Sequence, residues 1–308
     1  MAEMIGNVKL DYTFYDGEDV YNEGDDVEEK VLQTVKDSTD YYDYLKVMLE
    51  DNRYPVLYQL SRQRENIVEP MDIKKTDSVL EIGAGMGAVT GAIARKAGRV
   101  DCIDLSKRRS QANAYRNRHY TNIKIYVGNF QKIKLEQKYD VITLIGVFEY
   151  SQHYIKSDEP YEMMLKETYK YLKPNGKLYI AIENKLGLKY FAGRAEDHIG
   201  VPYVGIEGYN KEHKVKTFTR SQLEHLLIKS SFKDIFFYYP YPDYKMPIEI
   251  YSDKYLPRSD SYFKEDYNFD IDRIKIFDEG KAFDSLKGTD EIKSMFNSFL
   301  VEAVKEEK

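Results

Sequence analysis

From Ser78 onward, short apolar runs alternate with longer segments in which apolar residues recur every three or four positions. Runs of the first kind are typical of buried strands, and segments of the second kind are typical of amphipathic helices. Strands that alternate with helices at this spacing predict a parallel sheet with helices on both faces. The predicted strands cover residues 78–83, 99–106, 122–130, 139–150 and 176–184, and the predicted helices cover residues 88–98, 107–119 and 159–172.

After the alternating strands and helices, the pattern ends in a helix and a hairpin. Residues 219–231 predict one more helix, and residues 232–252 predict two strands joined by a short turn that contains proline. A hairpin at the end of a parallel sheet adds an antiparallel strand at or near its edge. The expected fold is therefore α/β and Rossmann-like, with a mainly parallel seven-stranded sheet, helices on both faces and a terminal antiparallel hairpin. Residues 294–304 fit a final helix or a final strand, and their periodicity does not decide between the two.

The segment before Ser78 has a different pattern. Residues 1–25 are acidic and carry Tyr, Gly and Asp turn signals, so we expect them to be ordered only where they dock on other parts of the chain. Apolar residues then recur at helical spacing from Asp26 to about Glu50. A second short helix is predicted from Pro55 to Ile67, with its proline in the first turn. We expect this segment to be a helical extension of the α/β core.

Composition limits the location and the partners. The chain has 308 residues and a net charge of −6, which disfavours broad binding to nucleic-acid backbones or anionic membranes. The single cysteine, Cys102, rules out an intrachain disulfide and favours the cytosol. The N-terminal residues lack the apolar core of a signal peptide, and no apolar run is long enough to span a bilayer. We therefore expect a cytoplasmic protein with no nucleic-acid partner and no membrane span.

A glycine-rich loop follows the first strand of the α/β pattern. It holds Gly83, Gly85 and Gly87, and glycines there allow a tight turn and the close approach of a ligand to the main chain. Asp104 stands 21 residues after Gly83, at the end of the second strand, where a carboxylate can accept both hydroxyls of a ribose. The loop, the acid and the strand order together predict a cofactor that contains a nucleoside.

Two cofactors of that kind are NAD and S-adenosylmethionine (SAM). The dinucleotide fingerprint fits Gly83, Gly85 and Ala88, but Glu81 would repel a pyrophosphate, the glycines are spaced as GxGxG, and the sheet ends in a hairpin rather than in a second mononucleotide-binding half. SAM has no phosphate and carries a cationic sulfonium and ammonium, which a nearby Glu81 would favour. We therefore expect SAM as the cofactor and S-adenosylhomocysteine as its product.

The motifs VLEIGAGMGAVT, CIDLS and YDVITLIGVFEY resemble those of class I SAM-dependent methyltransferases, over about residues 55–250. A narrower resemblance covers nearly the whole chain. The stretches YQLSRQRENIVEP, AIENKLGLKYFAGRAEDHIG, GIEGY and YPYPDYKMP resemble the methyltransferases, or methyltransferase domains, that accompany glycosyltransferases in bacterial surface-polysaccharide (lipopolysaccharide, rhamnan) biosynthesis. This resemblance implies a class I methyltransferase fold, a glycan-type acceptor and a glycosyltransferase as a candidate partner.

With this resemblance, the chain is expected to divide into three parts. Residues 1–70 would be an N-terminal extension that forms a helical cap over the cofactor site. Residues 71–256 would be the SAM-binding methyltransferase core, with an acceptor-side insertion at 184–216 that acts as a lid. Residues 257–308 would be a C-terminal extension packed on the core.

The cofactor contacts are expected at the ends of the strands and at one arginine before them. Arg64 is a candidate partner for the SAM carboxylate, because a guanidinium matches a carboxylate as a fork. The resembling family usually carries an acid after the third strand, whereas this chain has the neutral Asn129 there, followed by Phe130 as a candidate neighbour of the adenine. The predicted cofactor-binding residues are Arg64, Glu81, Gly83, Gly85, Asp104, Leu105, Asn129, Phe130 and Gly146.

Methyl transfer from a sulfonium relies mainly on positioning, and a hydroxyl acceptor also benefits from a general base. The candidate bases are Glu149, His153 and His198, which follow the fourth and fifth strands. No metal is expected, because the adjacent Glu196, Asp197 and His198 rarely all ligate one ion and no His-x-His or Cys spacing supports them. The predicted acceptor-binding residues, in the insertion and in the tyrosine-rich hairpin, are Glu183, Asn184, Tyr241, Asp243, Tyr244 and Lys245.

The predicted function is SAM-dependent transfer of a methyl group to a hydroxyl of a saccharide or activated-sugar acceptor. Two alternatives stay open: a methyltransferase that acts on a small metabolite or a peptide, and a non-catalytic SAM-binding partner of a glycosyltransferase. The basic runs RKAGR, SKRRS and RNRH fall mostly on predicted helices and are interpreted as solvated faces. The sequence does not give the oligomeric state.

Overall fold

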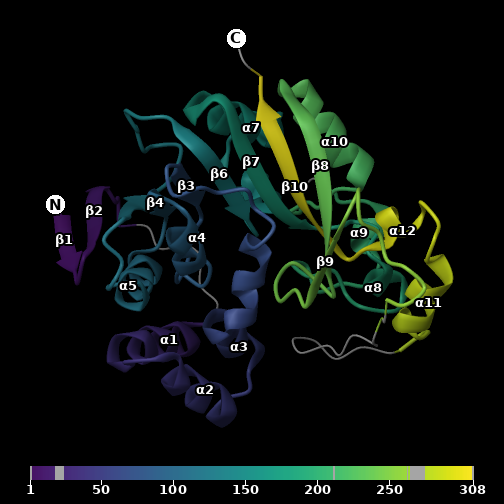
Figure 1. Cartoon of the computed structure of the whole chain (residues 1–308), viewed down its shortest axis with the longest axis horizontal. Helices are drawn as coiled ribbons and strands as arrows, with labels where there is room; N and C mark the ends of the chain where they lie inside the picture. The colour runs from purple at the N-terminus through teal and green to yellow at the C-terminus, as the bar shows by residue number, and fades with distance from the viewer. Residues whose placement is uncertain (1, 18–23, 211, 262, 264–274, 307–308) are drawn as a thin grey trace. The chain divides into compact units, whose positions relative to one another are not determined.

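The computed structural model of the protein describes residues 2–17, 24–210, 212–261, 263 and 275–306 (Figure 1). The chain forms two compact units. The first comprises Met1–Leu144 and Tyr171–Gly176, and the second comprises Ile145–Lys170 and Lys177–Lys308. The described residues form ten strands instead of the seven that the sequence pattern predicted.

The first unit contains six strands in the order β1-β2-β5-β4-β3-β6. The pairs β5–β4, β4–β3 and β3–β6 are parallel, as the alternating pattern predicted. Strands β1 and β2 were not predicted; they pair with each other antiparallel, and β2 pairs in parallel with β5. The expected helical extension therefore begins with strands. The bounds are β1 (Ala2–Ile5), β2 (Val8–Phe14), β3 (Ser78–Ile82), β4 (Arg99–Asp104), β5 (Ile123–Gly128) and β6 (Tyr139–Ile145).

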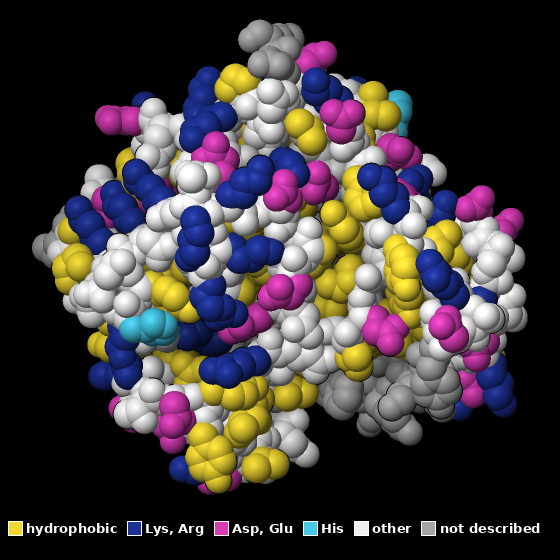
Figure 2. Space-filling model, viewed as in Figure 1, with side chains coloured by type: hydrophobic (Ala, Val, Ile, Leu, Met, Phe, Trp, Pro, Cys, Tyr) yellow, Lys and Arg dark blue, Asp and Glu magenta, His cyan; other side chains and the backbone are white. Residues whose placement is uncertain are grey.

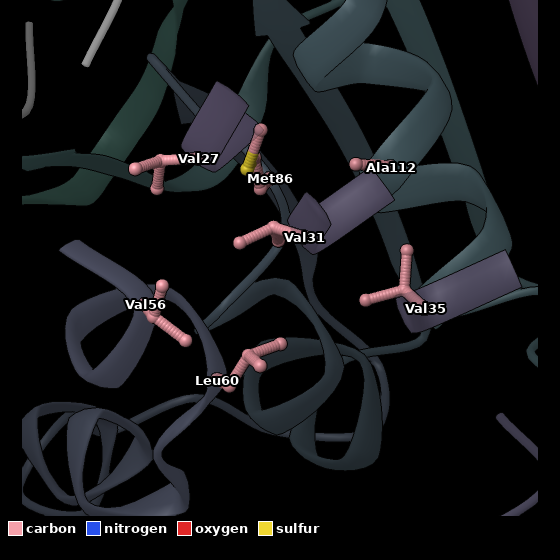
Figure 3. Packing of buried hydrophobic residues seen from close by; sticks show 7 residues of the cluster. All are labelled: Val27, Val31, Val35, Val56, Leu60, Met86 and Ala112. Carbon is pink, nitrogen blue, oxygen red and sulfur yellow. The ribbon is translucent and has the colours of Figure 1, made fainter. Parts of the chain in front are cut away.

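Helices surround these strands. Helix α4 packs against β4, helix α5 packs against β2, β4 and β5, and α1 packs against α5. Val27, Val31 and Val35 recur every four residues along α1, so they share one face and meet apolar side chains of α3, α5 and the loop after β3 (Figure 3). The bounds are α1 (Asp25–Asp37), α2 (Tyr41–Glu50), α3 (Tyr54–Leu60), η1 (Arg62–Val68), α4 (Thr90–Lys96) and α5 (Lys107–Arg116).

A buried ion cluster also joins α1 to α5. Glu28 is only 1% exposed, and its carboxylate accepts from Nε of Arg108 at 2.9 Å and from Nε of Arg109 at 2.8 Å. A buried carboxylate needs such partners, because an unpaired charge in the interior is costly. The interpretation of the run SKRRS as a solvated face is therefore wrong for Arg109, which is buried.

The second unit contains four strands in the order β7-β10-β8-β9. Strands β8 and β9 form the predicted antiparallel hairpin. Strand β10 pairs antiparallel with both β7 and β8, so the undecided residues 294–304 end in a strand. Together with β1 and β2, β10 accounts for the three strands beyond the expected seven. The bounds are β7 (Leu172–Glu183), β8 (Phe232–Tyr241), β9 (Glu249–Ser252) and β10 (Ser298–Lys305).

Aromatic side chains fill much of the core of the second unit. The ring of Tyr239 stacks on Phe296 at 5.0 Å, and the ring of Tyr241 meets Phe263 edge-on at 4.9 Å. Tyr241 was expected in an acceptor wall, but it is 7% exposed and belongs to this core. The helices are η2 (Phe148–Tyr150), α6 (Ser151–Tyr154), α7 (Pro160–Tyr171), α8 (Leu188–Phe191), α9 (Val204–Glu207), α10 (Arg220–Lys229), α11 (Glu279–Leu286) and α12 (Ile292–Met295). None of the helices in the described ranges has the length and apolar character required to cross a bilayer.

Candidate functional site

The loop after β3 adopts the backbone that its glycines permit. Gly83, Gly85 and Gly87 have φ values of 73°, 53° and 76°, in the left-handed region that strains other residues. The N–H groups of Gly83 and Ala84 donate to the carbonyl of Ile103 at 2.8 and 3.1 Å, which ties the loop to the end of β4. Gly83 is exposed and Gly85 is half-buried, so the main chain of the loop is accessible to a ligand.

Asp104 ends β4 and holds the same loop. Its Oδ2 accepts from the N–H of Gly85 at 2.7 Å, and its Oδ1 accepts from the N–H of Ser106 at 2.9 Å. Carboxylate oxygens accept more than one hydrogen bond, so these contacts do not exclude ribose hydroxyls. The side chain is half-buried rather than enclosed. The geometry therefore fits a nucleoside cofactor at the place that the sequence predicted.

Glu81 lies beneath this loop. It is 3% exposed, and its Oε2 accepts from Oγ1 of Thr90 at 2.7 Å, while Nδ2 of Asn113 donates to the same Thr90 oxygen at 3.1 Å. Burial raises the pKa of Glu81 to about 7, so its charge at neutral pH is only partial. Glu81 is thus placed to hold α4 and α5 under the loop, and its burial gives no support to the direct cofactor contact that was expected.

The other predicted cofactor-binding residues of the first unit differ in burial and in the partners that they already have. Arg64 is buried in η1, and its guanidinium lies over the ring of Tyr58 at 3.5 Å. Leu105 and Phe130 are half-buried. Oδ1 of Asn129 accepts from the N–H of the residue two positions on at 3.0 Å, so the oxygen expected to meet the adenine amine already has a donor.

A polar cluster in the second unit brings together residues that are far apart in the sequence. Glu149 comes from η2, Glu183 ends β7, His198 lies between α8 and α9, and Lys245 follows β8. Nε2 of His198 lies 3.3 Å from Oε2 of Glu183, and Nζ of Lys245 lies 2.8 Å from Oε1 of Glu183. Nδ1 of His198 shares a hydrogen bond of 3.0 Å with the hydroxyl of Tyr150. We call Glu149, Glu183, His198 and Lys245 the acid–histidine cluster.

The acid–histidine cluster contains buried polar atoms without hydrogen bonds. In the part of the chain that the structure describes, these are Oε2 of Glu149 and the two atoms of the 3.3 Å ion pair, Oε2 of Glu183 and Nε2 of His198. Buried polar atoms almost always have a hydrogen-bond partner, so three such atoms in one place are typical of a functional site. One ligating atom from each residue lies within 4.8 Å of the other two, which is also the donor set of a metal site. Nζ of Lys245, 2.8 Å from Oε1 of Glu183, also places a positive charge beside these donors.

The charges of this cluster depend on one another. Burial, reinforced by the charge of Glu183, raises the pKa of Glu149 to about 8. Burial disfavours the imidazolium of His198, but the carboxylate of Glu183 outweighs this, with a smaller contribution from Glu149 once it is ionised, and the pKa of His198 is raised to about 9. Burial also disfavours the charge of Glu183, but Lys245 and His198 outweigh it and lower the pKa of Glu183. At neutral pH, Glu149 therefore holds a proton, His198 is cationic and Glu183 is anionic.

A fully buried lysine supports the loop that carries His198. Nζ of Lys189 lies 2.7 Å from Oδ2 of Asp197 and 2.8 Å from Oδ2 of Asp243. The carboxylate of Glu196 accepts from the N–H of His198 at 2.8 Å. Sequence reasoning missed Lys189, whose only signal was a lysine within the apolar stretch LGLKYF. Asp243 was expected to contact the acceptor, but its carboxylate pairs with this lysine.

Three further predicted residues, Tyr244, Gly146 and Asn184, pack against or bond to other parts of the second unit. Oε1 of Glu183 accepts from the hydroxyl of Tyr244, which is buried, and that hydroxyl would lie 2.8 Å from a Cβ added to Gly146. Gly146 has a φ of 67° and thus leaves room for Tyr244. Asn184 is fully buried, and its amide donates to the carbonyls of residues 294 and 296 at 2.8 and 2.7 Å. Its expected role in binding the acceptor therefore has no support.

His153 does not belong to the acid–histidine cluster. It is exposed on α6, where its ring lies 4.7 Å from that of Tyr154. Partial burial and the charge of Lys214 lower its pKa. No contact between His153 and the cluster is seen among the described residues. Of the three candidate bases, the structure thus brings together His198 and Glu149.

Comparisons with known proteins agree with these features. The sequence family described as "Methyltransferase domain" matches residues 80–178. A putative methyltransferase of Bacillus subtilis, YrhH, is 31% identical over 136 residues, which are 43% of this chain and 72% of that protein. A probable ribosomal RNA small subunit methyltransferase A of Pyrococcus furiosus is 32% identical, but the match covers only 34% of this chain and 33% of that protein.

Solved structures of methyltransferases also match, at low sequence identity and with TM-scores under 0.5. A SAM-dependent methyltransferase of Thermotoga maritima, described as a possible histamine N-methyltransferase, matches with a TM-score of 0.48 at 12% identity, over 87% of this chain and all of that one. A phosphoethanolamine N-methyltransferase of Haemonchus contortus, bound to phosphoethanolamine and S-adenosylhomocysteine, matches with a TM-score of 0.49 at 13% identity, over 91% of this chain and 49% of that one.

Proposed function

The chain belongs to the SAM-dependent methyltransferases, and on that premise we propose that it methylates a hydroxyl group of a saccharide or activated-sugar acceptor. The observation that carries this proposal is the acid–histidine cluster. In it, the imidazole of His198, whose pKa is raised to about 9, lies beside two carboxyl groups. A hydroxyl must lose its proton to become a good nucleophile, and a positioned base contributes to that step. A glycosyltransferase partner and a cytoplasmic location remain predictions from the sequence.

The first unit is proposed to hold the cofactor. When bound, SAM supplies a methyl group on a sulfonium sulfur. Asp104 would accept the ribose hydroxyls, and the main chain at Gly83 and Gly85 would line the nucleoside. Arg64 remains our candidate for the carboxylate of the cofactor, because a guanidinium binds a carboxylate through two parallel hydrogen bonds.

The second unit is proposed to bind the acceptor. Among the charged side chains around the cluster, His198 is 8% exposed and Lys245 and Asp243 are each 15% exposed, whereas Glu183 is fully buried. An imidazole, an ammonium and a carboxylate together offer hydrogen-bond donors and acceptors, which a polyhydroxylated molecule needs. This polar edge supports a saccharide better than an apolar acceptor.

His198 is the proposed base. With its Nε2–H directed at the carboxylate of Glu183, 3.3 Å away, neutral His198 would take a proton at Nδ1, relayed from the acceptor hydroxyl through the hydroxyl of Tyr150, and Glu183 would stabilise the imidazolium that forms. The hydroxyl of Tyr150 at 3.0 Å from Nδ1 would fix the orientation of the ring. Glu149, protonated at neutral pH, is proposed to be a positioning group beside the imidazole.

Purified protein incubated with methyl-labelled SAM should transfer the label to oligosaccharides or nucleoside diphosphate sugars. Histamine, phosphoethanolamine and short peptides would be tested beside them, and products would be identified by mass spectrometry. Label on these amines or peptides but on no saccharide would contradict the proposed acceptor and favour the alternative of a small-metabolite or peptide acceptor. Tight binding of SAM without transfer to any probe would favour the non-catalytic alternative.

Asp104→Ala should weaken binding of S-adenosylhomocysteine by about 10- to 100-fold, because hydrogen bonds to a charged group contribute about 1.5–3 kcal/mol each. Isothermal titration calorimetry measures this change, and a melting curve checks that the loop held by Gly85 has not collapsed. Asp290→Ala is the control, since that side chain is 87% exposed and lies outside the first unit. Equal affinities of the two variants would contradict the assigned role of Asp104.

A further inference from the structure

The first unit contains a second feature that the proposed function does not use. A cavity of about 420 Å³ lies among the α1–α2 connection, the start of η1, helix α4 and the C-terminal end of α5. This volume is within the range of small-molecule sites. Gly83, Gly85 and Asp104 are not among the residues that line it, although Gly87 is. The cavity is therefore separate from the proposed ribose contacts.

The lining of this cavity is strongly basic. Arg62, Arg95, Arg116 and Arg118 line it, against two acids, Asp40 and Glu65. Figure 2 shows Lys and Arg side chains, in dark blue, gathered over the part of this face where α3, α4 and α5 lie. Such a local concentration of positive charge is unusual in a chain with a net charge of −6.

Two of the four arginines have a structural role. Arg95 pairs with Glu65, so these two charges neutralise each other. Arg118 donates to the carbonyls at the end of α1, with NH2 2.6 Å from the oxygen of Ser38. The carboxylate of Asp40 accepts from the first turn of α2 at 2.7 Å. In the described part of the chain, Arg62 and Arg116 therefore have no carboxylate partner.

Arg116 carries the most direct sign of a missing ligand. Its NH2 donates to the carbonyl of Gln59 at 2.6 Å, but its Nε is buried without an acceptor among the described residues. Burial lowers the pKa of Arg116, and the groups that raise it, among them Glu65, do not offset the effect of burial. Buried donors in native proteins are paired in the great majority of cases. Arg116 also lines the cavity, so an anionic group there would supply a negative charge beside its guanidinium.

The aromatic lining adds a second element of recognition. The guanidinium of Arg62 lies 4.2 Å from the ring of Tyr41, and that of Arg116 lies 5.5 Å from the ring of Tyr44. A guanidinium fixed over a ring keeps its planar fork of donors in a defined orientation. Guanidinium groups match the geometry of phosphate oxygens, and two guanidinium groups without a carboxylate partner among the described residues match a group with more than one negative charge.

We propose that this cavity binds a small phosphate ester, with the phosphate held by Arg62 and Arg116. The ligand could be a nucleotide or a sugar phosphate, because both present the same anionic group. The site is independent of the acid–histidine cluster and of the identity of the methyl acceptor.

Isothermal titration calorimetry on the full chain tests this proposal, with the protein saturated with S-adenosylhomocysteine so that the cofactor site is filled. The probes are uridine diphosphate, glucose 1-phosphate, inorganic pyrophosphate and uridine. We expect at least one of the two esters to bind with a dissociation constant below about 1 mM and with an affinity that falls as salt is raised, whereas uridine should not bind. Failure of both esters to bind, or binding only when S-adenosylhomocysteine is omitted, would overturn the proposal.

Two variants locate the site. Arg62→Gln and Arg116→Gln should each weaken the bound ester by about 10-fold or more, since each removes charge-assisted hydrogen bonds. Arg62 is exposed, so its variant stays informative even if Arg116→Gln impairs folding. Arg258→Gln is the matched control, because this exposed arginine also lies over a tyrosine ring, that of Tyr255, at 4.9 Å. Equal affinity in Arg62→Gln and Arg258→Gln would show that the ester binds elsewhere.

Discussion

His198→Asn should slow methyl transfer by about 100- to 10,000-fold, which is the usual contribution of a general base. Asparagine keeps a polar group of similar reach but cannot take up the proton of a hydroxyl. The proposed cofactor contacts lie in the first unit, so the affinity for S-adenosylhomocysteine should stay close to that of the unchanged protein. Single-turnover rates and calorimetry measure these two quantities separately.

The pH dependence gives a second signature of the same residue. A base acts in its deprotonated form, and the pKa of His198 is raised to about 9 mainly because Glu183 outweighs the effect of burial. The rate of the unchanged protein should therefore rise with pH through the neutral range and level off only above about pH 9. His198→Asn should lose this rise. A flat profile of the unchanged protein would contradict the assignment of His198 as the base.

The matched control is His153→Asn. His153 also follows the fourth predicted strand, but it is exposed and lies outside the acid–histidine cluster. Its replacement should leave the rate and the pH profile unchanged. If instead His153→Asn is slow and His198→Asn is not, the base has been assigned to the wrong histidine.

Lys189→Met should destabilise the second unit by about 3–5 kcal/mol, the usual effect of removing one partner of a buried ion pair. Methionine fills a similar volume, but the carboxylates of Asp197 and Asp243, now 2.7 and 2.8 Å from the ammonium, would lose their common counter-charge. Urea unfolding, followed by a probe in the second unit, measures the change. Because Asp197 precedes His198, turnover should fall as well.

A double variant separates charge from packing. Asp197 keeps Arg194 as a partner at 3.0 Å, so Lys189→Met combined with Asp243→Asn removes the carboxylate that loses this lysine and should be more stable than Lys189→Met alone. Lys281→Met is the surface control, since that side chain is 85% exposed and should change the stability by less than about 0.5 kcal/mol. A Lys189→Met variant as stable as this control would mean that the buried lysine is not needed to balance the two carboxylates.

The cofactor half of the site could be predicted because its signals are local. Gly83, Gly85 and Asp104 are separated by one strand–helix–strand unit, and the parallel pairing of β3 and β4 necessarily brings the ends of these strands together. The burial of Glu81 could not be predicted in the same way. An acid two residues before the glycines can point to the ligand or beneath the loop, and its contact with Thr90 on α4 decides between the two.

The acid–histidine cluster could be predicted only as a set of separate candidates. Glu149, Glu183, His198 and Lys245 come from four different elements, so only tertiary packing decides that they meet and that His153 does not. Tyr241 and Asn184 show the opposite error. Aromatic and amide side chains suit a ligand site and a buried core equally well, and here Tyr241 packs in the core while Asn184 fixes backbone carbonyls.

Strands β1 and β2 were missed, and β10 was left undecided between a helix and a strand, for different reasons. Val8 and Leu10 are fully buried and alternate with residues that face outward, so β2 carries a period-two signal. The signal was missed because the acidic composition and the turn residues of this segment decided its interpretation. Residues 298–305 have too few polar positions to reveal a period, and a fully buried strand and a buried helix then look alike.

The position of β10 governs the order in which the chain can fold during synthesis. Strand β10 lies between β7 and β8, so β7 and the β8–β9 hairpin cannot join until residues 298–305 have left the ribosome. The parallel strands β3 to β6 end at Ile145 and can pair long before that point. A nascent chain would thus carry unpaired edges on β7 and β8 through the translation of the whole region from Tyr241 to Ser298. During that interval these edges are open to aggregation or to chaperone binding.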